Sequence, residues 1–354
     1  MVEVAVTSIG DHDEFLARWS QLSADCPDAG FFQSPQWMRA WLGGAPESVR
    51  LYKVEAVKDG RALLMGVFAA PKGKLRTLGL REIWFQEFGE PARDIVYPEY
   101  LDFLAPREGA LELRAQAAGA IMDYFSSEDG FVFRNARMRL MSAVLSAAAA
   151  REFSARILRE QPVYVCALND GDFISRLSKS LQAKIRRSMR LYEERGGLTA
   201  RLAETADDKR AAYEKLKELH QQRWRARGLS GVFENAHFSA FHQRLWAHAQ
   251  DRLHLFEVRA GEETVGVLYN FIHGKRVLNY QSGFKIEDDN RFAPGFVAHA
   301  LAAQFYQDQG FEAYDLLAGE EEYKARLGEP ETILTSFVVE RPSWRNRLRG
   351  WIKG

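Results

Sequence analysis

The sequence is poor in the features that mark several large classes of protein. It contains two cysteines, Cys26 and Cys166, which are too few for a disulfide framework and too isolated for a structural zinc site. Its 48 basic residues are balanced by 48 acidic ones, so it lacks the excess of positive charge that is typical of nucleic-acid-binding proteins. We therefore expect no DNA partner.

Long hydrophobic runs and known cofactor motifs are missing as well. The longest apolar run, LMSAVLSAAAA, is far shorter than the roughly 20 residues that a helix needs to cross a bilayer, and the first residues show no secretory signal. The sequence contains no Walker loop, dinucleotide GxGxxG, HExxH, GxSxG or paired CxxC motif. These absences predict a cytoplasmic protein without a metal or a permanently bound cofactor.

Two segments about two hundred residues apart share one pattern, which suits a chain of 354 residues with two domains. VEAVKDGRALLMGVFAAPKGK starts at Val54 and FEVRAGEETVGVLYNFIHGKR starts at Phe256. Each reads as a strand, a charged turn with Gly, a strand with a central Gly and a Gly-Lys turn. We interpret them as two copies of one α/β unit, although strand-turn-strand patterns are common enough to coincide by chance.

The second copy is the easier one to read. A helix is predicted from Asp172 to Gly197, followed by a strand, two helices, three strands, a helix from Pro294, a strand, a short helix and a last strand. This order predicts a mixed, mostly antiparallel sheet with helices on its faces. We expect an N-terminal domain over residues 1–165, a C-terminal domain over 166–340 and a basic tail over 341–354.

The helix predicted to begin at Pro294 has no cap at its start. RFAPGFVAHALAAQFYQDQG offers neither an acid in the first turn nor a Ser, Thr, Asp or Asn at the cap position. The free backbone N–H groups and Arg291 just upstream favour an anion there, and Gly295 would let it approach closely. Alternatively, the Pro-Gly pair simply starts a buried helix.

Several pieces of the second half carry a family resemblance. LSKSLQAKIRRSMRLYEERGG, RWRARG, YQSGF, APG and YDLLAGEEEYK resemble the GNAT-type acetyltransferases encoded with cellulose and exopolysaccharide synthesis genes, which are similar to the FemABX peptidyltransferases. The resemblance is clear from Asp172 to Glu340 and thinner over residues 31–168. It implies an α/β fold of two tandem GNAT-like domains, with acetyl-CoA or another acyl-CoA as co-substrate. The sequence departs from the family at Gln182, where an arginine is expected, and in its glycine-poor RFAPG loop.

The resemblance places the donor's pyrophosphate at the start of the Pro294 helix. The residues expected to bind the donor are Arg291, Gly295, Phe296 and Ser282. Strand alternation in NYQSGF predicts Tyr280 and Ser282 on one face, with Gln281 on the other. By similarity to GNAT enzymes, Tyr280 would protonate the leaving thiolate, although an ordinary core tyrosine is the alternative.

A second set of residues is expected to bind the acceptor substrate. It comprises Lys179, Arg186, Arg190, Arg223, Trp224 and Tyr323. Helical spacing places the first three on the side opposite an apolar stripe formed by Ile174, Leu177, Leu181, Ile185 and Tyr192, where a phosphorylated sugar would relieve their repulsion. Arginine beside tryptophan suits a phosphate and a flat base or sugar. A solvated helix face and anchoring of the second helix are the alternatives.

Two catalytic residues are implied by the FemABX relatives. Lys324, on the short helix after Gly319, corresponds to a late lysine that lines the active site there, and would polarise the acyl carbonyl or hold a phosphate. Asp102, in PEYLDFL, corresponds to an acid from the first domain that would deprotonate the acceptor ammonium. Ordinary surface positions are the alternative for both.

These features predict an N-acyltransferase that moves an acyl group from a thioester to an amino sugar or another cell-envelope or exopolysaccharide precursor. No activated Cys or Ser is evident, so transfer would be direct. The expected partner is a nucleotide- or lipid-linked sugar. Two alternatives stay open: an aminoacyl-tRNA-dependent peptidyltransferase, which the zero net charge disfavours, and a non-catalytic GNAT-like subunit of a polysaccharide machine.

The tail, RPSWRNRLRGWIKG, carries five cations and no acid, with Trp344, Leu348, Trp351 and Ile352 at helical spacing. Such a helix suits an anionic membrane surface, where each nearby cation contributes about 1 kcal/mol. Packing of its tryptophans on the C-terminal domain is the alternative. If the tail binds the inner face of the membrane, the full-length protein should co-sediment with anionic liposomes more than a version that ends at Glu340. Equal binding by both versions, or by neither, would contradict a membrane contact.

Overall fold

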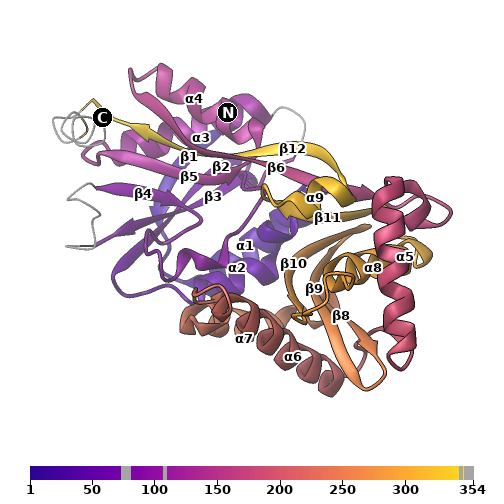
Figure 1. The fold of residues 1–354 in the computed structure, drawn as a ribbon. Coiled ribbons are helices and arrows are strands. Elements are labelled where there is room, and N and C mark those ends of the chain that lie inside the picture. The colour runs from indigo at the N-terminus through magenta and orange to yellow at the C-terminus, as the bar shows by residue number, and fades with distance from the viewer. Residues whose placement is uncertain (73–80, 107–109, 343–345, 347–354) are drawn as a thin grey trace. The chain divides into compact units, whose positions relative to one another are not determined.

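The computed structural model describes residues 1–72, 81–106, 110–342 and 346, so most of the tail lies outside the described residues. The described chain divides into two compact units (Figure 1). Unit 1 takes in residues 1–161, 240–245 and the described residues from 333 on, whereas unit 2 takes in 162–239 and 246–332. The boundaries expected at 165 and 340 stay predictions. No helix in this part of the chain is long and apolar enough to cross a bilayer.

Unit 1 is built on a mixed sheet with the strand order β1-β2-β3-β4-β5-β12-β6. Neighbours from β1 to β4 are antiparallel, β4 and β5 are parallel, and β5 and β12 are antiparallel. Its elements are β1 (Glu3–Ser8), α1 (His12–Ala24), α2 (Pro35–Leu42), β2 (Val49–Lys58), β3 (Arg61–Pro71), β4 (Glu82–Phe85), α3 (Ala110–Tyr124), β5 (Gly130–Ala136), α4 (Met138–Ala149), β6 (Ser154–Ala167) and β12 (Glu329–Glu340), the last two being shared with unit 2.

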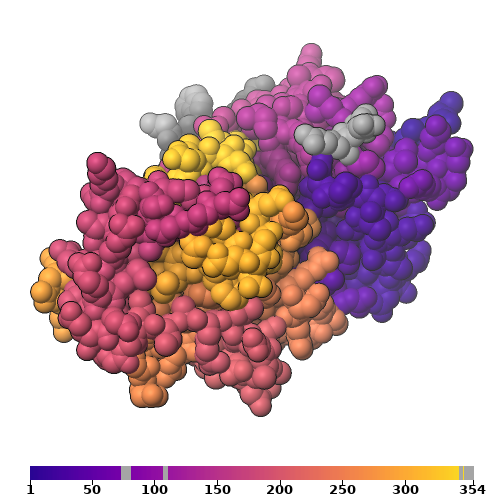
Figure 2. All heavy atoms as spheres, turned by 90° about the vertical axis from the view of Figure 1, so that its right-hand side faces the viewer, coloured from indigo at the N-terminus to yellow at the C-terminus, as the bar shows by residue number. Residues whose placement is uncertain are grey.

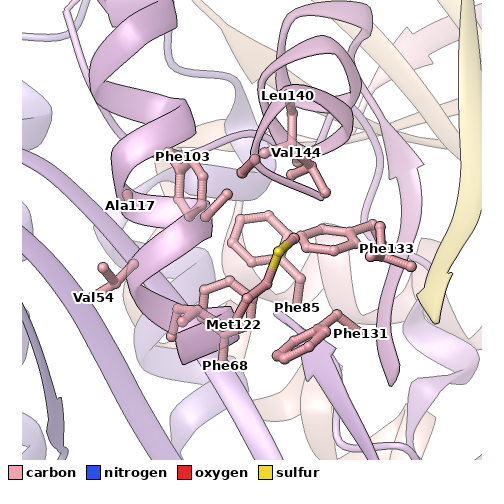
Figure 3. Close-up of a cluster of buried hydrophobic side chains, with 14 of the residues drawn as sticks. Val54, Phe68, Phe85, Phe103, Ala117, Met122, Phe131, Phe133, Leu140 and Val144 are labelled. Atoms are coloured by element: carbon pink, nitrogen blue, oxygen red, sulfur yellow. The ribbon is translucent and has the colours of Figure 1, made fainter. Parts of the chain in front are cut away.

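Aromatic side chains fill the centre of unit 1 (Figure 3). Phe68 of β3, Phe85 of β4 and Phe133 of β5 are buried, and their ring centroids lie 5.0 to 6.1 Å apart. Ala117 and Met122 of α3 belong to the same cluster. Because these residues come from separate elements, burying their apolar surface holds three strands and a helix together.

Unit 2 repeats this arrangement, with the strand order β6-β11-β10-β9-β8-β7. Its elements are α5 (Lys179–Glu194), β7 (Leu198–Leu202), α6 (Ala206–Arg225), α7 (Ala236–Ala249), β8 (Leu253–Ala260), β9 (Glu263–His273), β10 (Arg276–Phe284), α8 (Pro294–Asp308), β11 (Ala313–Ala318) and α9 (Glu322–Leu327). An antiparallel hairpin, a third antiparallel strand, a helix and a parallel strand follow one another as β2-β3-β4-α3-β5 and again as β8-β9-β10-α8-β11. The predicted pair of mixed, mostly antiparallel α/β units is confirmed.

The long helix predicted over Asp172 to Gly197 is wrong at its start. A 3-10 turn covers Phe173–Arg176, and α5 begins only at Lys179, with Ser178 as its cap. Gln182 donates hydrogen bonds from Nε2 to the carbonyl oxygens of Ser175 and Leu177, at 2.9 and 2.7 Å. These polar side chains satisfy the backbone at the break, so the expected apolar stripe spans two separate elements.

In unit 1 the parallel strands β4 and β5 are paired over a short stretch, and a segment that lies between them in the sequence occupies the space beyond it. β4 and β5 pair over three positions, from Glu82 with Gly130 to Trp84 with Val132. Further along, Leu101 bridges to β5 and Leu104 bridges to β3. The segment from 101 to 104 therefore continues the line of β4 and occupies the space beside β5.

Asp102 lies in this segment and is fully buried. Arg114 of α3 donates to its two carboxylate oxygens at 2.8 and 3.1 Å, and Arg139 of α4 donates to one of them as well. The side chain has no exposed surface through which it could reach an acceptor molecule. The catalytic part that the resemblance implies for Asp102 stays a prediction, while the geometry is that of a structural ion pair.

Replacing Asp102 by asparagine should lower the free energy of unfolding by about 3–5 kcal/mol, because it leaves buried arginine charge without its counterion. Urea denaturation of the purified protein measures this difference. The matched control is Asp123→Asn, which removes an exposed carboxylate that pairs with Arg151 and should cost less than about 1 kcal/mol. An Asp102→Asn variant of unchanged stability but lost activity would instead favour the catalytic interpretation.

Candidate functional site

In unit 2 the two parallel strands, β10 and β11, separate after their paired positions. Among the described residues, no segment bridges to them as residues 101–104 bridge to the strands of unit 1. β10 and β11 pair from Arg276 with Ala313 to Leu278 with Asp315. Immediately afterwards both strands become irregular: β10 gains an extra residue at Tyr280, and β11 is irregular around Leu317, whose φ is +60°. Among the described residues no bridge joins the two strands beyond this level. The carboxyl ends of parallel strands that separate in this way are a common position for ligands.

The irregularity in β10 corrects the predicted alternation around Tyr280. Ser282 donates a hydrogen bond to the side chain of Asn279 at 3.1 Å, so these two residues share a face although they are three apart. The Tyr280 ring stacks on Phe271 instead, with 4.5 Å between centroids. Tyr280 and Ser282 therefore lie on opposite faces, because the extra residue reverses the period of two within the strand.

Helix α8 begins at this opening, as predicted, and without a side-chain cap. Ala293 is its N-cap residue, no acid lies in its first turn, and Ser188 of α5 accepts a hydrogen bond from the Ala293 N–H at 2.9 Å. A Cβ at Gly295 would lie 3.2 Å from the Phe284 ring, so α8 packs closely on the end of β10 at this residue. The helix start offers backbone N–H groups and a partial positive charge.

Two cations flank the first turn of α8. The ammonium of Lys184 lies 5.0 Å from the centre of the Phe296 ring, and the guanidinium carbon of Arg326 lies 5.1 Å from it. Lys184 has no carboxylate within ion-pair distance among the described residues, and the single such contact of Arg326 is with Glu322 at 3.7 Å. Together with the helix end they make a strongly positive surface around Phe296.

Arg291 is engaged elsewhere. Its guanidinium pairs with Asp289 at 2.6 Å, and its own backbone N–H donates to the same carboxylate at 2.9 Å. Hydrogen bonds from Arg291 lower the pKa of the Asp289 carboxyl, so this exposed pair persists at neutral pH. A donor phosphate would have to compete with Asp289 for Arg291, at a cost that is small for an exposed pair.

A buried histidine lies beneath the opening. His299 of α8 is 2% exposed, and its ring contacts Phe284 of β10, Tyr314 of β11 and Tyr323 of α9. Burial and the nearby Lys324 charge lower the pKa of His299 to about 3, so the ring is neutral at physiological pH. His299 therefore contacts both β10 and β11 as a neutral side chain.

The two ring nitrogens of His299 have different surroundings. Its Nδ1 lies 2.9 Å from the Tyr314 hydroxyl, whereas its buried Nε2 has no partner among the described residues. If the Tyr314 hydroxyl donates to Nδ1, the ring proton of the neutral histidine lies on Nε2. In that tautomer the site holds a buried N–H donor that lacks an acceptor, and a ligand oxygen would supply one.

Lys324 lies on α9, and its side chain is buried against the loop between β11 and α9. Its ammonium donates to the carbonyl oxygens of Ala318 at 2.7 Å and Leu317 at 3.4 Å, and it contacts the carboxylate of Glu321 at 3.3 Å. These three contacts tie the end of β11 and the following loop to α9, which also carries Tyr323, whose ring stacks on His299. A contact between Lys324 and a substrate stays a prediction.

The basic residues of α5 form an exposed face of unit 2. Lys179, Arg186 and Arg190 are all exposed, and α5 lies on the side of the molecule that Figure 2 turns toward the viewer. Arg186 makes a loose ion pair with Asp172 at 3.4 Å. The expected face exists, and substrate binding to it stays a prediction.

Arg223 and Trp224, at the end of α6, have different surroundings. The Trp224 Nε1–H donates to His220 Nε2 at 2.9 Å, which anchors the indole to its own helix. Burial and the Arg227 charge lower the pKa of Arg223, and no carboxylate of the described residues pairs with it. Arg223 is thus available to an anionic ligand, whereas Trp224 has a structural contact.

Comparison with known proteins agrees with this geometry. Residues 179–325 match the family described as Acetyltransferase (GNAT) domain. The matched segment is a GNAT-type domain. The structure of FemX is similar, with a TM-score of 0.61 and 10% identity over 99% of this chain and 100% of FemX. L-PGS from Bacillus licheniformis has a TM-score of 0.54 and 11% identity over 98% of this chain and 97% of its own. No curated protein matches the sequence.

This GNAT-type segment runs from the first residue of α5 into α9, and so contains both β10 and β11 and the point where they separate. FemX and L-PGS share the fold of this chain along essentially their full lengths. The predicted resemblance to FemABX proteins is confirmed at the level of the fold. The association with exopolysaccharide synthesis stays a prediction.

Sequence reasoning missed three residues of the site: Lys184, His299 and Arg326. Lys184 and Arg326 are separated by more than one hundred and forty positions and meet only because α5 and α9 both approach the start of α8. His299 resembles an ordinary core residue in the sequence, because it follows Gly295 by one helical turn within an apolar run. No local pattern distinguishes these residues.

Replacing Lys184 and Arg326 together by alanine should weaken binding of coenzyme A at least tenfold, because a charge-assisted contact to a phosphate contributes roughly 1.5–3 kcal/mol. Isothermal titration calorimetry with coenzyme A measures the dissociation constant. Lys215→Ala is the control, since it removes a unit 2 cation that pairs with Glu218 on α6. The site would be disproved if the double variant bound like the parent protein or the control lost as much affinity.

Proposed function

We propose that this GNAT-type protein is an N-acyltransferase. It takes an acyl group from a coenzyme A thioester and passes it to the amine of an amino sugar or another cell-envelope or exopolysaccharide precursor. The observation that carries the proposal is the opening in unit 2, where β10 and β11 separate beside an uncapped, cation-flanked helix start. The corresponding gap in unit 1 is filled by residues 101–104, which favours unit 2 as the donor-binding unit.

The donor would make two sets of contacts, one through its pyrophosphate and one through its acyl-bearing arm. Its pyrophosphate would lie on the N–H groups at the start of α8, between Lys184 and Arg326. Its acyl-bearing arm would enter the opening between the strands, where the Nε2–H of His299 can donate to one of its carbonyl oxygens. A neutral histidine suits this role because it donates without placing a second buried charge beside Lys324.

Transfer would be direct. The acceptor amine attacks the acyl carbon, a C–N bond forms, the C–S bond breaks, and the thiolate and one amine proton leave as the thiol of coenzyme A. The protein's own thiols are poor nucleophiles, because burial raises the pKa of Cys26 to about 11 and that of Cys166 to about 12. Neither is therefore expected to carry the acyl group.

Aminoacyl transfer from tRNA is the second candidate, because the fold of FemX covers the whole chain. The equal numbers of basic and acidic residues weigh against a large RNA partner. A non-catalytic GNAT-like subunit is the third candidate, favoured by Gln182 and the glycine-poor loop. If the protein is such a subunit, the opening between β10 and β11 would bind a donor without catalysing its transfer.

Release of free thiol from acetyl-CoA in the presence of amino sugars tests the proposal. We expect turnover with an amino sugar, and a His299→Phe variant should lower kcat/KM about tenfold or more while keeping the ring stacked on Tyr323. Nitrogen-15 NMR of the histidine ring should show the proton on Nε2. Binding of acetyl-CoA without turnover would favour the non-catalytic subunit, and binding of aminoacyl-tRNA alone would favour peptidyl transfer. A fully active His299→Phe variant would remove His299 from the site.

A further inference from the structure

The chain of unit 1 makes a fifteen-residue excursion between the end of β4 and the bridge at Leu101. Three of its non-glycine residues have positive φ angles: Gln86 at 51°, Tyr97 at 40° and Tyr100 at 56°. The excursion is nevertheless firmly held, since the Trp41 ring of α2 stacks on Phe88 with 4.6 Å between centroids. Strained residues in a well-packed loop of this length are a recognised property of binding sites.

Two buried carboxylates of this loop share one arginine. Glu87 and Asp94 are 2% and 3% exposed. Arg134 of β5 donates from Nε to Glu87 Oε2, and its Nη2 lies 3.9 Å from Asp94. When both acids are ionised, this group of side chains carries one negative charge in excess. A buried charge without a counterion is unfavourable unless it is protonated or paired with a ligand.

The same group leaves hydrogen-bonding atoms unused. Among the described residues, the second carboxylate oxygen of Glu87 has no partner, although its first oxygen is bound by Arg134. The neighbouring Gln86 is 3% exposed, and neither the oxygen nor the nitrogen of its amide has a partner. Two acceptors and one amide donor on neighbouring residues are thus buried without partners, a combination that native structures rarely leave empty.

Aromatic rings connect this cluster with the surface. The guanidinium carbon of Arg134 lies 5.7 Å from the centre of the Trp84 ring and 6.0 Å from that of Tyr97, which is 51% exposed. Trp84 packs directly on Gly89, where a Cβ would come within 2.7 Å of the indole nitrogen. Burial raises the pKa of Glu87 to about 8 and that of Asp94 to about 6, so a bound cation would replace a proton here.

We propose that Gln86, Glu87 and Asp94 form a binding site for a small molecule that carries a primary ammonium group beside a hydroxyl. The ammonium would donate to the unused oxygens of Glu87 and Gln86 and neutralise the excess charge. The Gln86 amide nitrogen requires an acceptor, which the neighbouring hydroxyl supplies. A metal ion fits less well, because no group of three or more potential ligands occurs among the described residues.

This site goes beyond acyl transfer. All of its residues belong to unit 1, and none belongs to the opening of unit 2. Its ligand belongs to the class of amino alcohols, of which amino sugars are one kind. Binding can be measured without any acyl donor, so an inactive enzyme and an empty ammonium site give different results.

Glucosamine and N-acetylglucosamine are suitable probes, because they share a ring and hydroxyls and differ in the charge on nitrogen. In an NMR titration of the full chain without donor, glucosamine should shift the side-chain signals of Gln86 and Arg134 and bind at least tenfold more tightly than N-acetylglucosamine. Glu87→Gln should reduce that affinity at least tenfold. Glu90→Gln, in the same loop but bonded to Ser48 and Arg93, should leave it within twofold.

If Glu87→Gln fails to fold, as judged by its NMR spectrum, Gln86→Leu provides the second test and should also lose at least tenfold in affinity. Equal affinity for the two sugars, or no binding at all, would overturn the proposal and assign the unused atoms to a buried water. An equal loss in Glu90→Gln would overturn it as well, since the effect would then belong to the loop as a whole.

Discussion

In each unit two neighbouring parallel strands share only three paired positions, and the backbone beyond them needs other partners. The units meet this requirement differently. Unit 1 brings its chain back, so that Leu101 and Leu104 bridge to the flanking strands and Asp102 is locked beneath two arginines. Unit 2 gives both strands irregular registers, and among the described residues no bridge joins them beyond the third pair. One constraint therefore produces a closed unit and an open one from the same order of elements.

The two units also differ in the sign of their local charge. The opening of unit 2 is bordered by Lys184, Arg326 and an uncapped helix start, which together favour phosphates. The excursion in unit 1 concentrates buried carboxylates around Arg134, which favours a cation. Because the net charge of the whole sequence is zero, these opposite local preferences are invisible in its composition.

The parts of the fold that depend on local chemistry were predictable from the sequence. The two hairpins follow from turn glycines such as Gly60 and Gly261, both of which have positive φ angles, and the uncapped start at Pro294 follows from missing cap residues. The break before Lys179 was missed because the Gln182 side chain, rather than a proline or glycine, makes it.

Contacts made at long range were not predictable. The extra residue at Tyr280 is apparent only in its pairing with β9, and the burial of Asp102 depends on Arg114 and Arg139 from two helices. Lys184 and Arg326 meet at the Phe296 ring, and His299 meets Tyr323, only because α5, α8 and α9 pack together. Periodicity carries no information about such contacts, and the family resemblance pointed to the start of the Pro294 helix without naming these residues.

The passage of β12 from unit 2 into unit 1 has a consequence for synthesis on the ribosome. Val338 and Val339 of β12 pair with Val132 and Phe131 of β5, which are made some two hundred residues earlier. While the intervening chain is being translated, one edge of the unit 1 sheet lacks this neighbour and exposes free backbone groups. Residues 162–239 and 246–332 need no such late strand to form their own sheet, so the unit that begins later in the sequence can be completed first.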